Sequence, residues 1–183
     1  MKCPKCKTVE LRATKLEDGL LAHGCSDCNG VFVSLLYYRD WAERTRYGLQ
    51  EEGIATPQDS FSNIEADDSV TALTCPKCAR LMRKFKVSGN HTNRLDLCTS
   101  CDEAWLDGGE WELLKALALS HEMPKVFTEE WQKRVRKQTL DNERGARFER
   151  LVGTAERAKA EEVRDWLKDH PHRQEILFYL NHE

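Results

Sequence analysis

Long apolar runs are missing from this sequence of 183 residues. No stretch approaches the roughly 20 apolar residues that cross a bilayer, so we expect no transmembrane helix and no membrane partner. The first residues, MKCPKCK, also lack the apolar segment and the small-residue cleavage site of an export signal. We therefore expect a cytoplasmic protein. In that compartment thiols stay reduced, and paired cysteines usually bind a metal.

The chain also lacks an excess of positive charge. Its 28 Lys and Arg residues are outnumbered by 31 Asp and Glu residues, which gives a formal net charge of −3. This balance disfavours sequence-independent binding to nucleic acid, which depends on neutralising many phosphates. No Ser-His-acid arrangement, phosphate-binding glycine loop or isolated nucleophilic cysteine stands out. We therefore expect that the protein is not an enzyme.

Cysteine is what the chain does have, in a regular pattern of four Cys-x-x-Cys pairs. The pairs are formed by Cys3, Cys6, Cys25, Cys28, Cys75, Cys78, Cys98 and Cys101. The second pair of one half aligns with that of the other at an offset of 98 − 25 = 73 residues. Four thiolates from two short turns suit a tetrahedral Zn²⁺ ion, so we predict two zinc ions, one per half. Disulfides, unconnected buried thiols or another metal such as iron are the alternatives.

Between its two cysteine pairs, each half has the pattern of a β-hairpin. In the first half LRATKLE and LLAHG flank the turn signal Asp18-Gly19, and in the second LMRKFKV and TNRLDL flank Ser88-Gly89-Asn90. A hairpin brings the two turns together at one end, where a metal can join them. We predict a small α+β fold with two tandem zinc ribbons, each followed by a helix, and an α-helical C-terminal tail.

Each half resembles the bacterial transcription factor IIB-like zinc-ribbon (zinc finger) family, whose pattern is Cys-Pro-x-Cys, a hairpin, then Cys-x-x-Cys-x-Gly-x-Trp-Leu-Asp-x-Gly-Glu. The second half reads CPKC and then CTSCDEAWLDGGE, with Glu103 in place of the glycine. The first half is the more divergent copy, because it keeps Gly30 but has Phe32, Val33 and Ser34 instead of Trp, Leu and Asp. The resemblance implies two zinc sites and little about activity, since most members lack an assigned role.

The WLDGGE stretch is interpreted as structural rather than catalytic. Asp107 and Glu110 have the spacing of a capping box before the helix WELLKALAL, and Ser34 is predicted to cap LLYYRDWAERTRY in the first half. Trp105 and Phe32 are predicted to cover the zinc end of each ribbon, because so small a ribbon has little other core.

The predicted organisation has four parts. They are the first ribbon and helix (1–48), an acidic linker (49–72), the second ribbon and helix (73–122) and a helical C-terminal region (123–183). An element docked on a ribbon through Phe61 and Ile64 is the alternative for the linker.

Three helices are predicted in the C-terminal region. Thr128 would cap the first, over 129–152; the second covers 154–169; the third begins at Pro171, with Asp169 or His170 as its cap. A helical-hairpin seam is predicted from Ala158, Val163, Trp166, Leu167, Ile176, Leu177 and Leu180.

The function predicted from these features is that of a zinc-binding adaptor or regulatory protein, which docks on a protein partner in transcription or translation. The first alternative is a nucleic-acid binder that uses the basic second hairpin, with Arg80, Arg83, Lys84, Lys86 and Arg94. The second is a zinc or thiol redox sensor. His23 lies near the first zinc site, where we expect it to pack rather than to bind the metal.

Overall fold

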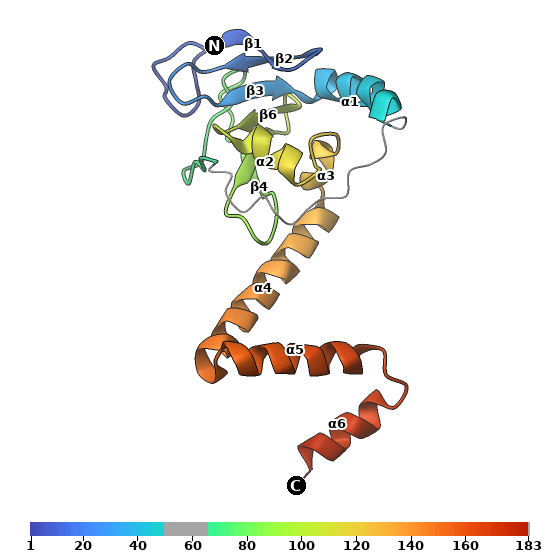
Figure 1. Cartoon of the computed structure of the whole chain (residues 1–183). Helices are drawn as coiled ribbons and strands as arrows, with labels where there is room; N and C mark the ends of the chain where they lie inside the picture. The colour runs from blue at the N-terminus through green and yellow to red at the C-terminus, as the bar shows by residue number, and fades with distance from the viewer. Residues whose placement is uncertain (50–65, 183) are drawn as a thin grey trace. The chain divides into compact units, whose positions relative to one another are not determined.

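The computed structural model describes residues 1–49 and 66–182, and of these the side chains of 47–49 are left aside (Figure 1). Most of the predicted acidic linker, including the docking alternative at Phe61 and Ile64, therefore lies outside the described residues.

The described chain forms two compact units, Met1–Gln138 and Thr139–Glu183. The first unit is built on one antiparallel sheet of six strands, in the order β1-β2-β3-β6-β5-β4. Its strands are β1 (Arg12–Glu17), β2 (Leu20–Gly24), β3 (Val31–Ser34), β4 (Arg83–Lys86), β5 (Arg94–Cys98) and β6 (Glu103–Leu106). The two predicted hairpins are present as β1–β2 and β4–β5.

A third strand in each ribbon, β3 or β6, was missed by the sequence analysis. These two strands pair with each other and join the ribbons into one sheet. Phe32 lies opposite Trp105, and the two residues occupy the same place in the repeat, since 32 + 73 = 105. The ribbons are thus related by an approximate two-fold axis through this pair. Neither β3 nor β6 is left as an open sheet edge.

The two faces of the sheet have different coverings. On one face pack the helices α1 (Leu35–Leu49), α2 (Glu110–Ala116) and α3 (Met123–Val126). The other face carries the cysteines together with Phe32 and Trp105. Because side chains alternate along a strand, Ala104 and Leu106 of β6 face the helices while Trp105 between them faces the cysteines.

The predicted capping box at the start of α2 is only half present. Glu110 Oε2 accepts a hydrogen bond from the Asp107 amide at 2.8 Å, as expected. The N-cap residue is Gly109, with φ 85°, and not Asp107. The Asp107 carboxylate instead accepts hydrogen bonds from Trp105 Nε1 at 3.0 Å and from the Ser69 amide at 2.6 Å. Asp107 therefore joins three segments of the second ribbon.

The first helix, α1, begins directly after Ser34 and is anchored to the other ribbon. The amide of Leu35 donates to the carbonyl of Asp102 at 3.0 Å. In the part of the chain that the structure describes, the Ser34 hydroxyl makes no capping hydrogen bond to α1. The β3–β6 pairing explains this difference, because it places the Asp102 carbonyl beside the first turn of α1.

Three further helices follow, namely α4 (Glu129–Val152), α5 (Thr154–Lys168) and α6 (Arg173–Asn181). Thr128 Oγ1 accepts a hydrogen bond from the Trp131 amide at 3.2 Å, so the predicted cap of α4 is confirmed. The third helix begins later than predicted, with His172 as its N-cap residue. None of the described helices combines the length and apolar character that a membrane crossing requires.

Most side chains of the predicted apolar seam in the C-terminal region are not buried within the described residues of the second unit. Leu167 is buried and Ile176 is half-buried. The other predicted seam residues stay exposed, and Trp166 and Leu180 keep 57% and 59% of their surface. The helices α5 and α6, which carry these side chains, do not bring enough apolar surface together to cover them.

Candidate metal centres

The eight cysteines gather into two groups of four. In each group all four Sγ atoms lie within 4.8 Å of one another. The first group is Cys3, Cys6, Cys25 and Cys28, and the second is Cys75, Cys78, Cys98 and Cys101. The Sγ–Sγ distances are 3.7 Å for Cys3 and Cys28, 3.8 Å for Cys6 and Cys25, and 3.5 Å for Cys78 and Cys98. Four sulfurs around a tetrahedral Zn²⁺, each about 2.3 Å from the ion, lie about 3.8 Å apart. The donor set and its spacing therefore fit one zinc ion per group.

The same backbone turn forms all four cysteine pairs. The residue after each second cysteine has a positive φ, and these angles are 64° at Lys7, 54° at Asn29, 58° at Ala79 and 54° at Asp102. This left-handed conformation lets the amide of Lys7 donate to the carbonyl of Cys3 at 2.8 Å, and the amide of Ala79 to Cys75 in the same way. This conformation is hard to predict at Lys7 and Ala79, because neither residue is glycine.

Within each pair the two sulfurs differ in exposure. The first cysteine is buried and the second is half-exposed. Among the second cysteines, a hydrogen bond from the Arg80 amide lowers the pKa of Cys78 to about 7, whereas partial desolvation and the neighbouring thiols of Cys25 and Cys3 raise the pKa of Cys6 to about 11. A bound zinc ion needs all four thiolates, so metal binding competes with protons at these sulfurs.

Phe32 and Trp105 pack against the cysteines, as predicted for residues that cover the zinc sites. They are 1% and 0% exposed. The Trp105 ring also extends over Gly30 of the other ribbon, where an added Cβ would lie only 2.8 Å from Trp105 Cη2. A glycine is therefore needed at position 30.

The pseudo-symmetry explains why the second half has Glu103 where the family pattern has glycine. Glu103 is the repeat counterpart of Gly30, since 30 + 73 = 103. By the approximate two-fold axis, the aromatic residue that faces Glu103 is Phe32, which is smaller than tryptophan. Glycine is thus kept opposite the large ring and replaced opposite the small one.

Residues 2–44 match a known zinc-ribbon family. It is described as "Transcription factor zinc-finger", of the transcription factor IIB type. The match falls on the half that the sequence pattern marks as divergent and includes its four cysteines. The cluster of four cysteines at 75–101 fits a second ribbon through its geometry. No curated protein and no solved structure matches the chain.

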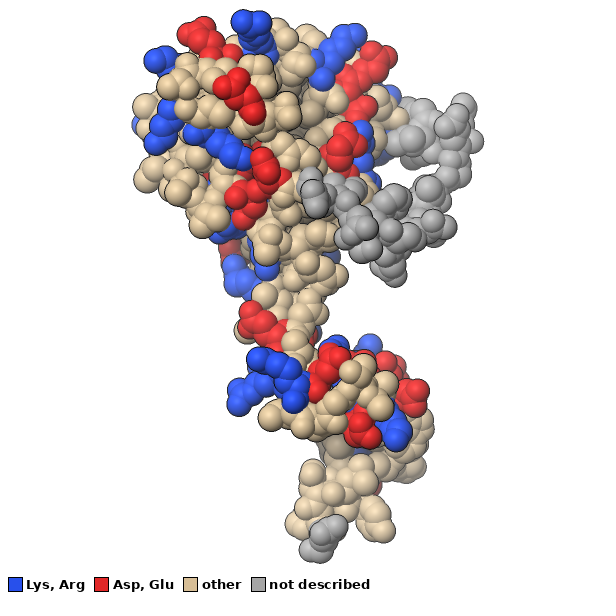
Figure 2. All heavy atoms as spheres, turned by 60° about the vertical axis from the view of Figure 1, so that its left-hand side comes forward, with Lys and Arg blue, Asp and Glu red and all other residues tan. Residues whose placement is uncertain are grey.

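Two of the five basic residues predicted to contact phosphate are paired with acids. Lys84 lies 2.7 Å from Asp96, and Arg94 lies 2.7 Å from Asp68. On the face shown in Figure 2, Lys and Arg side chains alternate with Asp and Glu and do not form a separate positive patch. His23 is exposed on β2 and is not one of the clustered metal ligands.

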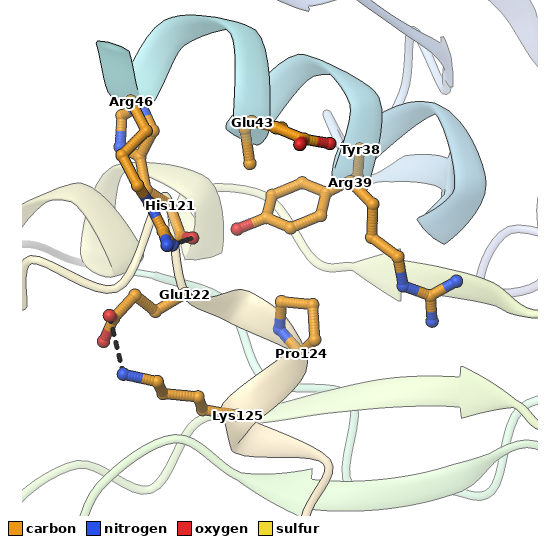
Figure 3. A pocket seen from close by; sticks show the side chains of 9 residues that line it. Tyr38, Arg39, Glu43, Arg46, His121, Glu122, Pro124 and Lys125 are labelled. Atoms are coloured by element: carbon orange, nitrogen blue, oxygen red, sulfur yellow. Dashed lines mark hydrogen bonds and ion pairs between the residues drawn. The ribbon is translucent and has the colours of Figure 1, made fainter.

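A surface pocket of about 470 Å³ lies between α1 and the segment that joins α2 to α3 (Figure 3). The Tyr38 hydroxyl donates to the Ser120 carbonyl at 2.7 Å and accepts from the Met123 amide at 3.0 Å. Burial raises the pKa of Tyr38 to about 12. Lys125 at the rim pairs with Glu122 at 2.6 Å. These groups hold α1 against the second ribbon.

Proposed function

We propose that this zinc-binding protein is a non-enzymatic adaptor, in which the ribbons form a rigid platform and the C-terminal unit docks on a protein partner. The main support is the exposed apolar surface of the described part of that unit. Trp166 on α5 is 57% exposed, and Phe178, Tyr179 and Leu180 on α6 are 67%, 79% and 59% exposed. Concentrations of large apolar side chains on a surface are typical of interaction sites.

Burying this surface would contribute a substantial part of the energy of a specific complex. Fully burying one large apolar side chain contributes about 1.5–3 kcal/mol. The four side chains are only 57%, 67%, 79% and 59% exposed, so burying what remains supplies about 4–8 kcal/mol before the costs of association. The helix α6 has 9 residues, and helices of this length depend on tertiary packing for their stability. A partner that covers α6 would provide that packing.

The family likeness of residues 2–44 supports a partner in transcription, and translation is the second possibility from the sequence. The charge distribution favours a protein over a nucleic acid. Lys84 and Arg94 are already neutralised by nearby carboxylates, so a phosphate would have to displace Asp96 or Asp68. The basic hairpin thus offers less binding energy than the sequence suggested.

Affinity purification from the source cell, with mass-spectrometric identification, tests the proposal. The variant Phe178→Glu/Tyr179→Glu changes two exposed residues of α6 and should lose the partner. The control Gln174→Glu/Asn181→Glu adds the same charge at exposed positions of the same helix and should retain it. The zinc content of both variants shows whether their zinc ribbons remain folded. Equal recovery of the partner with both variants would contradict the proposal, and recovery of nucleic acid alone would favour the alternative.

A further inference from the structure

Four carboxylates gather on the second ribbon, outside the two cysteine groups. Asp68 precedes β4, Asp96 lies on β5, Asp107 follows β6 and Glu110 begins α2. One oxygen atom of each of Asp68, Asp107 and Glu110 lies within 4.8 Å of the other two. Asp96, Asp107 and Glu110 are 0%, 2% and 0% exposed. The group is therefore almost completely withdrawn from water.

Three oxygens of this group are buried without a hydrogen-bond partner among the residues that the structure describes. They are Asp68 Oδ1, Asp96 Oδ1 and Glu110 Oε1. Leaving a buried polar atom unpaired costs about 1–3 kcal/mol, and more when the group is charged. Asp68 and Glu110 belong to the set whose oxygens lie within 4.8 Å of one another, so their two unpaired oxygens point to a ligand that they share.

The charges around the group do not balance. Asp67, which pairs with Lys5 at 3.0 Å, belongs to the same network because Lys5 also lies 3.5 Å from Asp107. With Asp67 included, five carboxylates face three bases, and the excess is 5 − 3 = 2 negative charges. The bases are Lys5, Lys84 and Arg94. Within the described ranges, none of them forms a salt bridge with Glu110.

We propose that Asp68, Asp107 and Glu110 bind one hard divalent cation of the Ca²⁺ class. Carboxylate oxygens are the ligands that such ions prefer, whereas the soft thiolates of the ribbons select zinc. Ligand oxygens 2.3–2.6 Å from one Ca²⁺ lie at most about 5 Å apart, which matches the observed spacing. Two positive charges also cancel the excess of two negative charges.

Such an ion would tie together segments that are distant in the sequence. Asp68 belongs to the segment 66–69, which follows the undescribed residues, and Asp107 and Glu110 belong to WLDGGE. The segment is already held to the ribbon, because the Asp67 amide donates to the Gly108 carbonyl at 2.8 Å. The Asn93 side chain also donates to the carbonyls of Ala66 and Asp67, at 3.2 Å and 2.9 Å. The cation would complete this attachment and is independent of any adaptor role.

A proton is the competing ligand. Burial raises the pKa of Glu110 to about 9, and the negative charges of Asp107, Asp68 and Asp96 act in the same direction, while Arg94 is the basic group that faces it. A cation would therefore compete with a proton at this carboxylate.

Terbium luminescence on the zinc-loaded protein tests the site, with Tb³⁺ as the probe and Ca²⁺ as the competitor. Trp105 Nε1 lies 3.0 Å from Asp107 Oδ1, so excitation of this indole should sensitise a bound Tb³⁺ ion. We expect saturable binding of one ion that Ca²⁺ displaces. Glu110→Gln and Asp68→Asn should each weaken binding by at least about tenfold.

Glu112→Gln is the matched control, since Glu112 lies on the same helix with a side chain that is 60% exposed. It should bind Tb³⁺ as the wild type does, and two zinc ions per chain show that each variant is folded. Absence of saturable binding to the wild type would overturn the proposal, as would equal losses in Glu110→Gln and Glu112→Gln.

Discussion

Gly30→Ala tests the aromatic pair at the junction of the ribbons. The new methyl group would lie 2.8 Å from Trp105 Cη2 and 3.0 Å from Cε2, distances that real Cβ atoms rarely adopt. The indole has no room to move away, because it is 0% exposed and is hydrogen-bonded through Nε1 to Asp107. Inserting a methyl group into a well-packed core costs about 1–3 kcal/mol. With a rigid ring as the obstacle, we expect about 3 kcal/mol of lost unfolding free energy.

The double variant Gly30→Ala/Trp105→Phe makes the prediction specific. Phenylalanine lacks the Cζ2 and Cη2 atoms that meet the new methyl group, so it should relieve the clash. Trp105→Phe alone should also destabilise the protein, since it leaves a gap and removes the hydrogen bond to Asp107. We expect the double variant to lose about 2 kcal/mol less unfolding free energy than the sum of the losses in the two single variants.

Urea unfolding at a fixed zinc concentration measures these differences through the midpoint and slope of each transition. Gly24→Ala is the control, because its Cβ would lie 3.0 Å from the Thr14 Cγ2 methyl, at the end of a half-exposed side chain on β1. It should cost less than about 1 kcal/mol. If Gly30→Ala is as stable as Gly24→Ala, or if the double variant is simply additive, the packing argument at the β3–β6 junction is wrong.

Three further predictions concern the metal centres. Elemental analysis should find two zinc ions per chain, and Cys98→Ser should reduce this to one, because the remaining three thiolates bind zinc less tightly. Ala79→Gly should raise the free energy of unfolding by up to about 1 kcal/mol in the same urea assay, because Ala79 has a positive φ of 58° that glycine adopts without strain. An unchanged urea midpoint would mean that this turn is unstrained. Mild oxidant should release zinc at the half-exposed Cys6 and Cys78, and a chromogenic chelator detects it; ribbons that remain loaded would exclude the redox-sensor alternative.

Local features of the sequence were sufficient to predict both hairpins and the helix α4. The turn signal Asp18-Gly19 is borne out by the positive φ of Gly19, 77°. Thr128 likewise marks the start of α4, which covers the predicted 129–152. Both signals act between residues close in the sequence, and such interactions can be recognised without a structure.

The pairing of β3 with β6 could not be predicted in the same way. The strands have four residues each, and their partners lie about 70 residues apart in the sequence. The positive φ angles after the cysteine pairs were missed because residues such as Lys7 and Ala79 rarely adopt this conformation by themselves. Here it accompanies the hydrogen bonds from their amides to the carbonyls of Cys3 and Cys75.

The eight cysteine ligands were predicted from spacing alone, whereas the carboxylate group was not. Asp107 and Glu110 were interpreted as a helix cap, and Asp68 was assigned to a flexible linker. Their convergence depends on the segment 66–69 folding back onto the second ribbon, where the Ser69 amide donates to Asp107. Nothing in the sequence near Asp68 indicates that contact.

The approximate two-fold axis between β3 and β6 has a consequence for how the halves can differ. If two identical single-ribbon chains paired along this edge, each contact across the axis would occur twice. Any substitution would then change both contacts at once. Because both halves belong to one polypeptide, a change on one side can be matched by a different change on the other. Trp105 against Phe32, together with Gly30 against Glu103 two residues earlier in each half, is such a matched pair, and two identical chains could not hold it.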